Sequence, residues 1–262
     1  MGSVTTEPLG RRARTRANTL AEIKATARRH LVEQGPSGIS LRAIARDMGV
    51  SAPALYRYFP SLDALITQLC VDLYVELRDV MRAECDTLPE DALVERLVTA
   101  AKTFRRWAVE HRPEFTLMFA SLAPGAVIAS PGCATAALDP ETEPYKSILM
   151  FARIFGDMFE RVYHQSDAER GFALRTPRIP ELPPELHDEL LRSSQAIGAN
   201  VPIEFAYTFQ SFWIRLYGLV AMEVFGQLPV VEQAEAMLDA ELATMAEFLG
   251  ATIEPSTERG RA

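Results

Sequence analysis

Residues 1–60 carry ten lysine and arginine side chains and only four acidic ones. The rest of the chain has the opposite balance, because 17 basic residues face 31 acidic ones there and the net charge of the whole is −8. Cationic side chains bind phosphate groups, and a basic head on an acidic body is typical of a protein that contacts nucleic acid through one end only. We therefore expect any nucleic-acid site to lie in this segment, the basic head (residues 1–60).

Side chains that could do catalytic chemistry are scattered along the chain. It has four histidines, which are far apart in sequence: His30, His111, His164 and His187. No nucleophile-elbow, dinucleotide-binding, P-loop or C-x-x-C motif occurs. A lone histidine among apolar residues is more often structural than catalytic. We therefore expect that the protein is not an enzyme and that it has no catalytic residue, no metal and no cofactor.

Composition and cysteine content indicate a globular protein of a reducing compartment. The chain has 262 residues, 48% apolar and 24% charged, which suits one domain plus a smaller companion. Its three cysteines, Cys70, Cys85 and Cys133, are too few for a disulfide-stapled secreted scaffold. The N-terminus lacks the apolar core of a signal peptide, so we expect a cytoplasmic protein. A metal site that combines Cys85 or Cys133 with a distant histidine remains an alternative.

One stretch is long enough to raise a membrane interpretation. Residues 115–138 carry no charged side chain, and such a length can span a bilayer. However, Pro124-Gly125 and Pro131-Gly132 interrupt it, and these pairs are turn signals. We expect a helix end followed by an apolar loop, and no membrane partner; a spanning helix is the alternative.

The basic head is expected to begin with a flexible arginine-rich arm over residues 1–17, followed by a helix. From Thr19 the apolar residues return every three or four positions, which is the helical period. Gly35-Pro36 ends this helix. A long connecting helix begins at Ser61 and follows leucines at four-residue spacing to about Cys85.

Two short helices separated by a glycine turn lie between these two. Ser40 is expected to cap the first of them and Ser51 the second, which Pro60 closes. Gly49 ends the first, since glycine accepts the left-handed conformation. Such a pair is typical of a helix-turn-helix, whose second helix enters the DNA major groove. We assign residues 18–61 to a helix-turn-helix DNA-binding domain; an ordinary α-helical bundle is the alternative.

After Ser61 the pattern stays helical to about residue 250, with no internal repeat and no convincing strand. Further helices are expected over residues 90–111, 113–122, 141–164, 185–197, 203–227 and 230–249. Prolines keep residues 165–184 mostly non-helical, and the polar tail 251–262 is expected to be disordered. The fold class is all-α, with an N-terminal three-helix DNA-binding domain and a C-terminal helical domain over residues 62–250.

The last two helices are expected to form a dimer interface. Between Ile203 and Phe225 only three residues are charged, and a helix that is apolar on every side must be buried on every side. In the final helix an apolar stripe steps by three and four from Val231 through Leu242 to Leu249. These two helices and their two-fold copies would make a four-helix interface; burial within one chain is the alternative.

A specific motif occupies residues 40–66, SLRAIARDMGVSAPALYRYFPSLDALI. It resembles the DNA-binding region of the TetR (tetracycline-repressor) family of transcriptional regulators: a short helix, a glycine turn, Ser-x-x-x-Leu-Tyr-x-Tyr-Phe, and a proline before the connecting helix. Residues 213–224, WIRLYGLVAMEV, are similar to a pattern of one C-terminal subfamily, in which Trp and His-Gly recur. Here Tyr217 stands in the place of the histidine.

The resemblance implies a homodimer that places its third helices in successive major grooves of a palindromic operator in double-stranded DNA. The positions that it implies for DNA contact are Arg42, Ser51, Ala52, Pro53, Ala54, Tyr56 and Arg57. Ser51 and Tyr56 are expected to touch phosphates, and Arg42 and Arg57 a guanine edge. Many relatives carry a lysine where Leu62 stands, so Arg16 and its neighbours in the arm are expected to replace that contact.

The resemblance also implies a small molecule that binds the C-terminal domain and releases the operator. Aromatic and methionine side chains of the body helices are expected to line an apolar pocket: Trp107, Phe115, Met118, Phe119, Phe151, Phe155, Met158, Phe159, Phe209, Trp213 and Tyr217. Each of them could instead belong to the core. Arg105, Arg106 or Arg153 could meet a carboxylate, although solvated arginines are the alternative.

We therefore expect a ligand-responsive transcriptional regulator, acting as a repressor that a largely apolar effector releases from DNA. The alternative is a helical ligand-binding protein or enzyme in which the helix-turn-helix is incidental.

Overall fold

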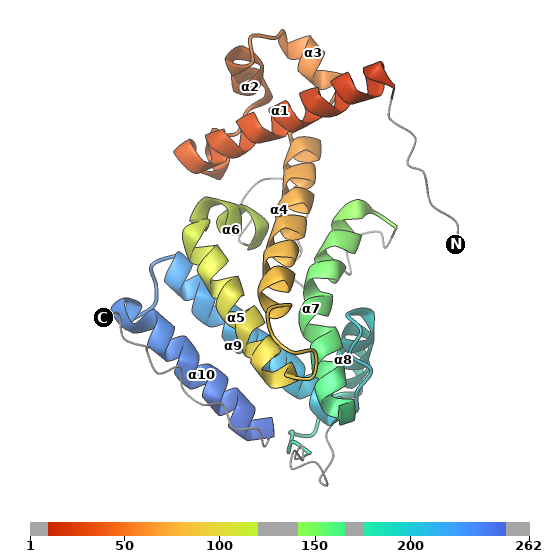
Figure 1. Cartoon of the computed structure of the whole chain (residues 1–262), viewed down its shortest axis with the longest axis vertical. Helices are drawn as coiled ribbons and strands as arrows, with labels where there is room; N and C mark the ends of the chain where they lie inside the picture. Colours follow the sequence, from red (N-terminus) through yellow and green to blue (C-terminus); the bar gives the residue numbers. More distant parts are fainter. Residues whose placement is uncertain (1–9, 120–140, 166–175, 250–262) are drawn as a thin grey trace.

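The computed structural model describes residues 10–119, 141–165 and 176–249 (Figure 1). Within these ranges the chain forms α-helices and short 3-10 turns and no strand, which confirms the all-α fold class. The helices are α1 (Arg11–Gln34), α2 (Leu41–Asp47), α3 (Ala52–Tyr56), α4 (Leu62–Cys85), α5 (Leu93–Glu110), α6 (Arg112–Phe119), α7 (Glu143–Gln165), α8 (Pro184–Ala196), α9 (Ile203–Val224) and α10 (Ala234–Leu249). Figure 1 shows α1–α3 at one end of the molecule, with α4 running from them into the remaining helices.

The first three helices share a small core that fixes their arrangement. Ile23 and Leu31 of α1, Ile44 of α2 and Leu55 of α3 are all fully buried, and burying each such side chain stabilises the fold by about 1.5–3 kcal/mol. Gly49 between α2 and α3 has φ of +67°, a left-handed conformation that side chains rarely adopt. The predicted glycine turn is therefore confirmed.

The predicted flexible arm is wrong for residues 11–17, because α1 already begins at Arg11. Alanine and arginine are among the best helix formers, and the Thr15 and Thr19 hydroxyls each donate to the carbonyl one turn earlier at 3.0 Å. The Arg16 guanidinium also lies 5.1 Å from the centroid of the Tyr58 ring, which ties this first part of α1 to the end of α3. Residues 1–9 lie outside the described residues.

The caps at the starts of the short helices differ from the prediction. Ser40 and Ser51 occupy the N-cap positions of α2 and α3, but neither hydroxyl bonds to the helix. Ser51 contributes its backbone carbonyl, which accepts from the amide of Ala54 at 2.9 Å. At the start of α4, in contrast, the Ser61 hydroxyl accepts from the amide of Ala64 at 3.1 Å, so this predicted helix start is confirmed.

The remaining helices surround α4. Figure 1 shows α5 and α7 beside α4, with α9 across them and α10 alongside α5 and α9. The helix predicted over 90–111 begins only at Leu93, because the residues from Pro89 to Ala92 form a turn closed by the Ala92 amide and the Pro89 carbonyl. Residues 176–183 are non-helical and α8 begins at Pro184, close to the predicted start.

Several predictions fall outside the described residues. They are the loop after Phe119 up to residue 138, Cys133 within it, residues 166–175, and the tail from residue 251. Among the residues that the structure does describe, no helix is long and apolar enough to cross a bilayer. No group of three or more histidine, cysteine or carboxylate side chains in these residues could hold a metal ion. The domain division after residue 61 stays a prediction.

Candidate nucleic-acid interface and apolar cavity

The residues implied for DNA contact lie on the outer side of the first three helices. In Figure 1, α2 and α3 are on the side of α1 that faces away from the body. Arg42, Ser51, Tyr56 and Arg57 are exposed, as is Pro53, whereas Ala52 and Ala54 are half-buried. The structure therefore brings these side chains to one end of the molecule, where a large partner could reach them.

Only part of the cationic surplus of the basic head faces outward. Lys24, Arg28 and Arg29 of α1 pair with carboxylates of α4, α6 and α2. Arg42 and Arg57 have no such ion pair among the described residues, and Arg46 is 80% exposed with only a 4.0 Å approach to Asp47. The outward cations are thus gathered on α2, α3 and the first turns of α1, where Arg16 is already engaged over Tyr58.

The buried His30 is structural. Its Nε2 lies 2.7 Å from a carboxylate oxygen of Asp47, and since a carboxylate only accepts, the imidazole donates from Nε2. Hydrogen bonds from His30 and then Arg29 lower the pKa of Asp47, although desolvation opposes them. This pair fixes α1 to α2, and so helps to set the orientation of the helix-turn-helix.

A second polar network, which sequence reasoning missed, joins α1 to the body. The Arg28 guanidinium donates to both carboxylate oxygens of Glu76 on α4, at 2.5 and 3.0 Å, and to Glu114 on α6 at 2.9 Å. The Trp107 indole also donates to Glu76 at 3.3 Å, and the His111 ring stacks on that indole with centroids 4.8 Å apart. We call Arg28, Glu76 and Glu114 the head–body ion network.

The electrostatics of this network favour its charged form. Glu114 is only 4% exposed, so its carboxylate depends on Arg28 for compensation. Desolvation alone raises the pKa of Glu76, but the hydrogen bonds and charge of Arg28 outweigh it and the net pKa is lowered. The sequence offered one signal for this buried ion pair of Arg28 and Glu114. Glu114 is an acidic residue that stands immediately before the uncharged segment 115–138.

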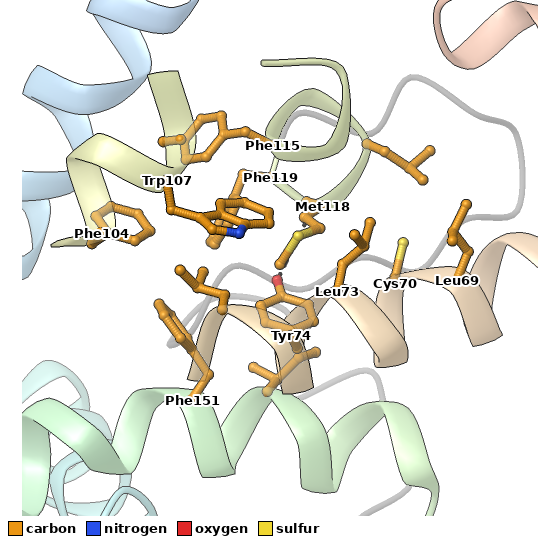
Figure 2. Close-up of a cluster of buried hydrophobic side chains, with 14 of the residues drawn as sticks. Leu69, Cys70, Leu73, Tyr74, Phe104, Trp107, Phe115, Met118, Phe119 and Phe151 are labelled. Carbon is orange, nitrogen blue, oxygen red and sulfur yellow. Dashed lines mark hydrogen bonds between the residues drawn. The ribbon is translucent and has the colours of Figure 1, made fainter. Parts of the chain in front are cut away.

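Seven of the eleven side chains predicted to line a pocket pack against one another in the core: Trp107, Phe115, Met118, Phe119, Phe151, Met158 and Tyr217. Figure 2 shows five of them around Tyr74, whose hydroxyl lies 3.5 Å from the Met118 carbonyl. The Phe115 and Phe119 rings stack with centroids 4.7 Å apart, and the Tyr217 hydroxyl donates to the Phe119 carbonyl at 3.1 Å. This part of the body is a solid aromatic core.

The other four, Phe155, Phe159, Phe209 and Trp213, line a cavity of about 100 Å³ between α5, α7, α9 and α10. Its remaining walls are Val94, Leu97, Val98, Ala101, Val162, Phe212, Leu216, Leu242, Met245 and Ala246. Sequence reasoning missed these because aliphatic residues at helical spacing look the same whether they face a cavity or a filled core.

None of the three arginines proposed to meet a carboxylate lines the cavity. Arg105 makes two hydrogen bonds of 2.7 Å to the buried Glu223. Arg106 pairs with Glu84 at 2.6 Å, and the exposed Arg153 lies 3.5 Å from the Ala196 carbonyl. Arg105 therefore anchors the end of α9 to α5, which is a structural role.

The middle of the apolar stripe of α10 packs against its own body, and the predicted dimer interface of the last two helices stays a prediction. Leu238, Leu242 and Met245 are buried in the same chain, because α10 packs onto α5 and α9. Among the described residues, apolar side chains left uncovered on these last two helices include Ile214 of α9, 61% exposed, and Met222 of α9, 40% exposed. Gly218 lies between them, and a Cβ at that position would meet no atom of the described residues within 4 Å. We call Ile214, Gly218 and Met222 the open face of α9.

Comparison with known families matches both parts of the chain. Residues 23–69 match "Bacterial regulatory proteins, tetR family", and residues 97–245 match "Tetracyclin repressor-like, C-terminal domain". The second match alone covers more than half of the 262 residues.

Curated relatives and solved structures agree with these matches. The chain is 27% identical over 221 residues to the HTH-type transcriptional regulators Rv1816 of Mycobacterium tuberculosis and Mb1846 of Mycobacterium bovis, covering 84% of this chain and 86% of each relative. A crystal structure of the regulatory protein SCO4313 superposes with a TM-score of 0.66 at 25% identity, over 91% of this chain and 100% of that one. A tetR-family regulator from Shewanella sp. PV-4, at 16% identity and a TM-score of 0.51 over 89% and 97% of the two chains, shares the fold.

Proposed function

Since the chain belongs to the tetR family of bacterial regulatory proteins, and is thus a DNA-binding transcriptional regulator, we propose that it is a homodimeric repressor released from its operator by an effector. Residues 18–61 are the DNA-binding domain in this proposal, and residues 62–250 bind the effector and the second subunit. The observation that carries it is the exposure of Arg42, Ser51, Tyr56 and Arg57 on or next to α2 and α3, the two helices on the side of α1 that faces away from the body (Figure 1).

The proposal gives each of these side chains a role. Helix α3 enters the major groove, where Arg57 and Arg42 can donate two hydrogen bonds each to a guanine edge. The hydroxyls of Ser51 and Tyr56 donate to phosphates, which is supported by the absence of any helix-capping bond at Ser51. The exposed arginines at the start of α1 add sequence-independent attraction to the DNA backbone.

A dimer is proposed to form through the open face of α9. An apolar helix face with a glycine at its centre allows a second helix to approach closely, and in the described part of the chain no atom lies within 4 Å of where a Cβ of Gly218 would be. A two-fold copy of the same face would cover Ile214 and Met222 and would hold two DNA-binding heads together. The exposed Met237 of α10 lies on the neighbouring helix and would widen this interface.

Release is proposed to pass from the body to the head through the head–body ion network. An effector can shift the equilibrium only by binding one conformation more tightly than the other. Because α6 and α4 both hold Arg28 of α1, a displacement of either helix changes the position of the head. The apolar cavity beside α5, α7 and α9 is the proposed effector site.

The test is DNA binding with a matched pair of variants. Fluorescence anisotropy on the DNA upstream of the protein's own gene should show salt-dependent binding. Arg57→Ala should weaken it by about 1–3 kcal/mol and relax base preference at one position in each half-site. Arg178→Ala, which removes an exposed arginine from the body, should leave binding unchanged. Equal effects of the two variants would contradict the proposed interface.

A further inference from the structure

Two cavities of the body share one wall. The larger, of about 100 Å³, lies among α5, α7, α9 and α10, and a smaller one of about 20 Å³ lies between α7, α8 and α9. Phe155, Phe209 and Trp213 line both of them. The Phe155 and Trp213 ring centroids are 5.9 Å apart. A change of rotamer at these rings would join the two spaces into one elongated site.

The two compartments differ in chemistry. Every side chain that lines the larger cavity is aliphatic, aromatic or methionine. The smaller cavity adds two neutral polar groups, the Ser193 hydroxyl and the Gln210 amide. Both residues are half-buried, and neither side chain hydrogen-bonds to any residue that the structure describes. Together they offer donors and acceptors to a polar group that reaches this end of the site.

Among the residues that the structure describes, no charged side chain lines either cavity. Burying an ion without a partner is very unfavourable in apolar surroundings. The nearby Arg105 is already held by Glu223, so it is not available to neutralise a bound anion. The lining therefore selects against carboxylates, phosphates and amines.

We propose that the site takes an uncharged, short-chain molecule with one neutral polar end, such as an alcohol, ketone or ester. Its chain fills the larger cavity and its polar end meets Ser193 and Gln210. The two spaces together come to about 120 Å³. A cavity of about 150 Å³ holds the six carbons of one benzene molecule, so a chain of roughly four to five carbons matches the scale of the joined site. Only the effect of such a ligand on DNA binding rests on the proposed function. Binding of the ligand to the protein can be measured without DNA.

The test compares three ligands of equal chain length by isothermal titration calorimetry on the full-length protein: 1-pentanol, pentanoate and pentylammonium. We expect 1-pentanol to bind and the two ions to bind at least tenfold more weakly. Ala101→Phe fills the larger cavity and should abolish pentanol binding, whereas Ala83→Phe, which adds the same ring at an exposed position of α4, should not. Ala246→Leu fills less space and provides a second variant if Ala101→Phe fails to fold.

A change at the polar end tests where the head group lies. Gln210→Glu keeps the shape of the side chain and introduces a negative charge, so pentylammonium should bind at least tenfold more tightly and 1-pentanol more weakly. Three results would overturn the inference: pentanoate binding as tightly as pentanol, pentanol binding unaffected by both cavity variants, or no binding of any of the three. If the cavity variants changed the oligomeric state and not ligand binding, a second copy of the chain would occupy the site, which would also overturn the inference.

Operator release is measured separately, so that the two proposals fail in different ways. Pentanol that binds with the expected selectivity but releases no DNA supports the ligand class and contradicts effector release. Release of DNA by a charged molecule, unchanged by Ala101→Phe and Ala246→Leu, contradicts the ligand class and leaves effector release standing.

Discussion

Removing the guanidinium from the head–body ion network should destabilise the protein strongly. Arg28→Met keeps most of the side-chain packing but leaves the Glu114 carboxylate, 4% exposed, without its cation. Breaking a buried pair in this way costs about 3–5 kcal/mol. The Glu76 carboxylate is 35% exposed, so water can replace its lost bonds and it adds little.

The loss of unfolding free energy caused by Arg28→Met should therefore be about 3–5 kcal/mol, most of it from the Glu114 carboxylate that is left buried without its cation.

The assay is urea denaturation followed by circular dichroism, at fixed protein concentration and fixed pH. Glu114→Gln in the Arg28→Met background removes the orphaned charge and should recover at least half of the loss, a coupling that a double-mutant cycle measures. Lys24→Met on the same helix removes a more exposed ion pair with Asp72 and should cost less than about 1 kcal/mol. An Arg28→Met variant no less stable than Lys24→Met, or no recovery by Glu114→Gln, would refute the reasoning.

Three further predictions concern the proposed dimer, Glu76 and the start of α1. Gly218→Glu should convert the proposed dimer to a monomer in sedimentation experiments without lowering monomer stability, since a Cβ there meets no atom of the described residues within 4 Å; a persistent dimer would move the interface elsewhere. Because the pKa of Glu76 is lowered in the folded protein, its carboxylate stabilises the fold above the unfolded pKa of about 4.3, and this stability is lost as the pH falls through the lower folded pKa. Glu76→Gln should therefore make the free energy of unfolding less sensitive to acid. An unchanged dependence of stability on pH would assign that sensitivity to other carboxylates. Tyr58→Leu removes the ring beneath Arg16, so amide exchange in the first turns of α1 should accelerate; unchanged protection would mean that helix propensity alone holds them.

Local patterns in the sequence were enough to predict most of the helices. The apolar period over α4, the glycine turn at Gly49 and the cap at Ser61 each depend on residues within a few positions. The start of α1 was missed because its first turns carry almost no apolar side chains. Their helical conformation therefore produces no three- to four-residue spacing of apolar residues in the sequence. Thr15 and the Arg16–Tyr58 contact stabilise it in ways that spacing does not reveal.

Predictions that depend on which surfaces meet were less successful. The stripe through Leu242 is visible in the sequence, but spacing cannot tell whether its neighbour belongs to the same chain or to a partner. Arg28 and Glu114 are 86 positions apart, so their pairing depends on the packing of α1 against α6. The cavity likewise exists only because four helices leave space between them, and the same aromatic residues would fill a core if those helices moved closer.

Selection of bound sequences from a random duplex DNA library tests the central claim most directly. If two identical heads held by α9 each place α3 in a major groove, the enriched sequence should be an inverted repeat. Its half-sites should be centred about one helical turn, roughly 34–36 Å, or a multiple of it apart. The Arg57→Ala variant should lose preference at one symmetric pair of positions while keeping the same spacing. Enrichment of no motif, or of a single half-site without its inverted copy, would contradict the account.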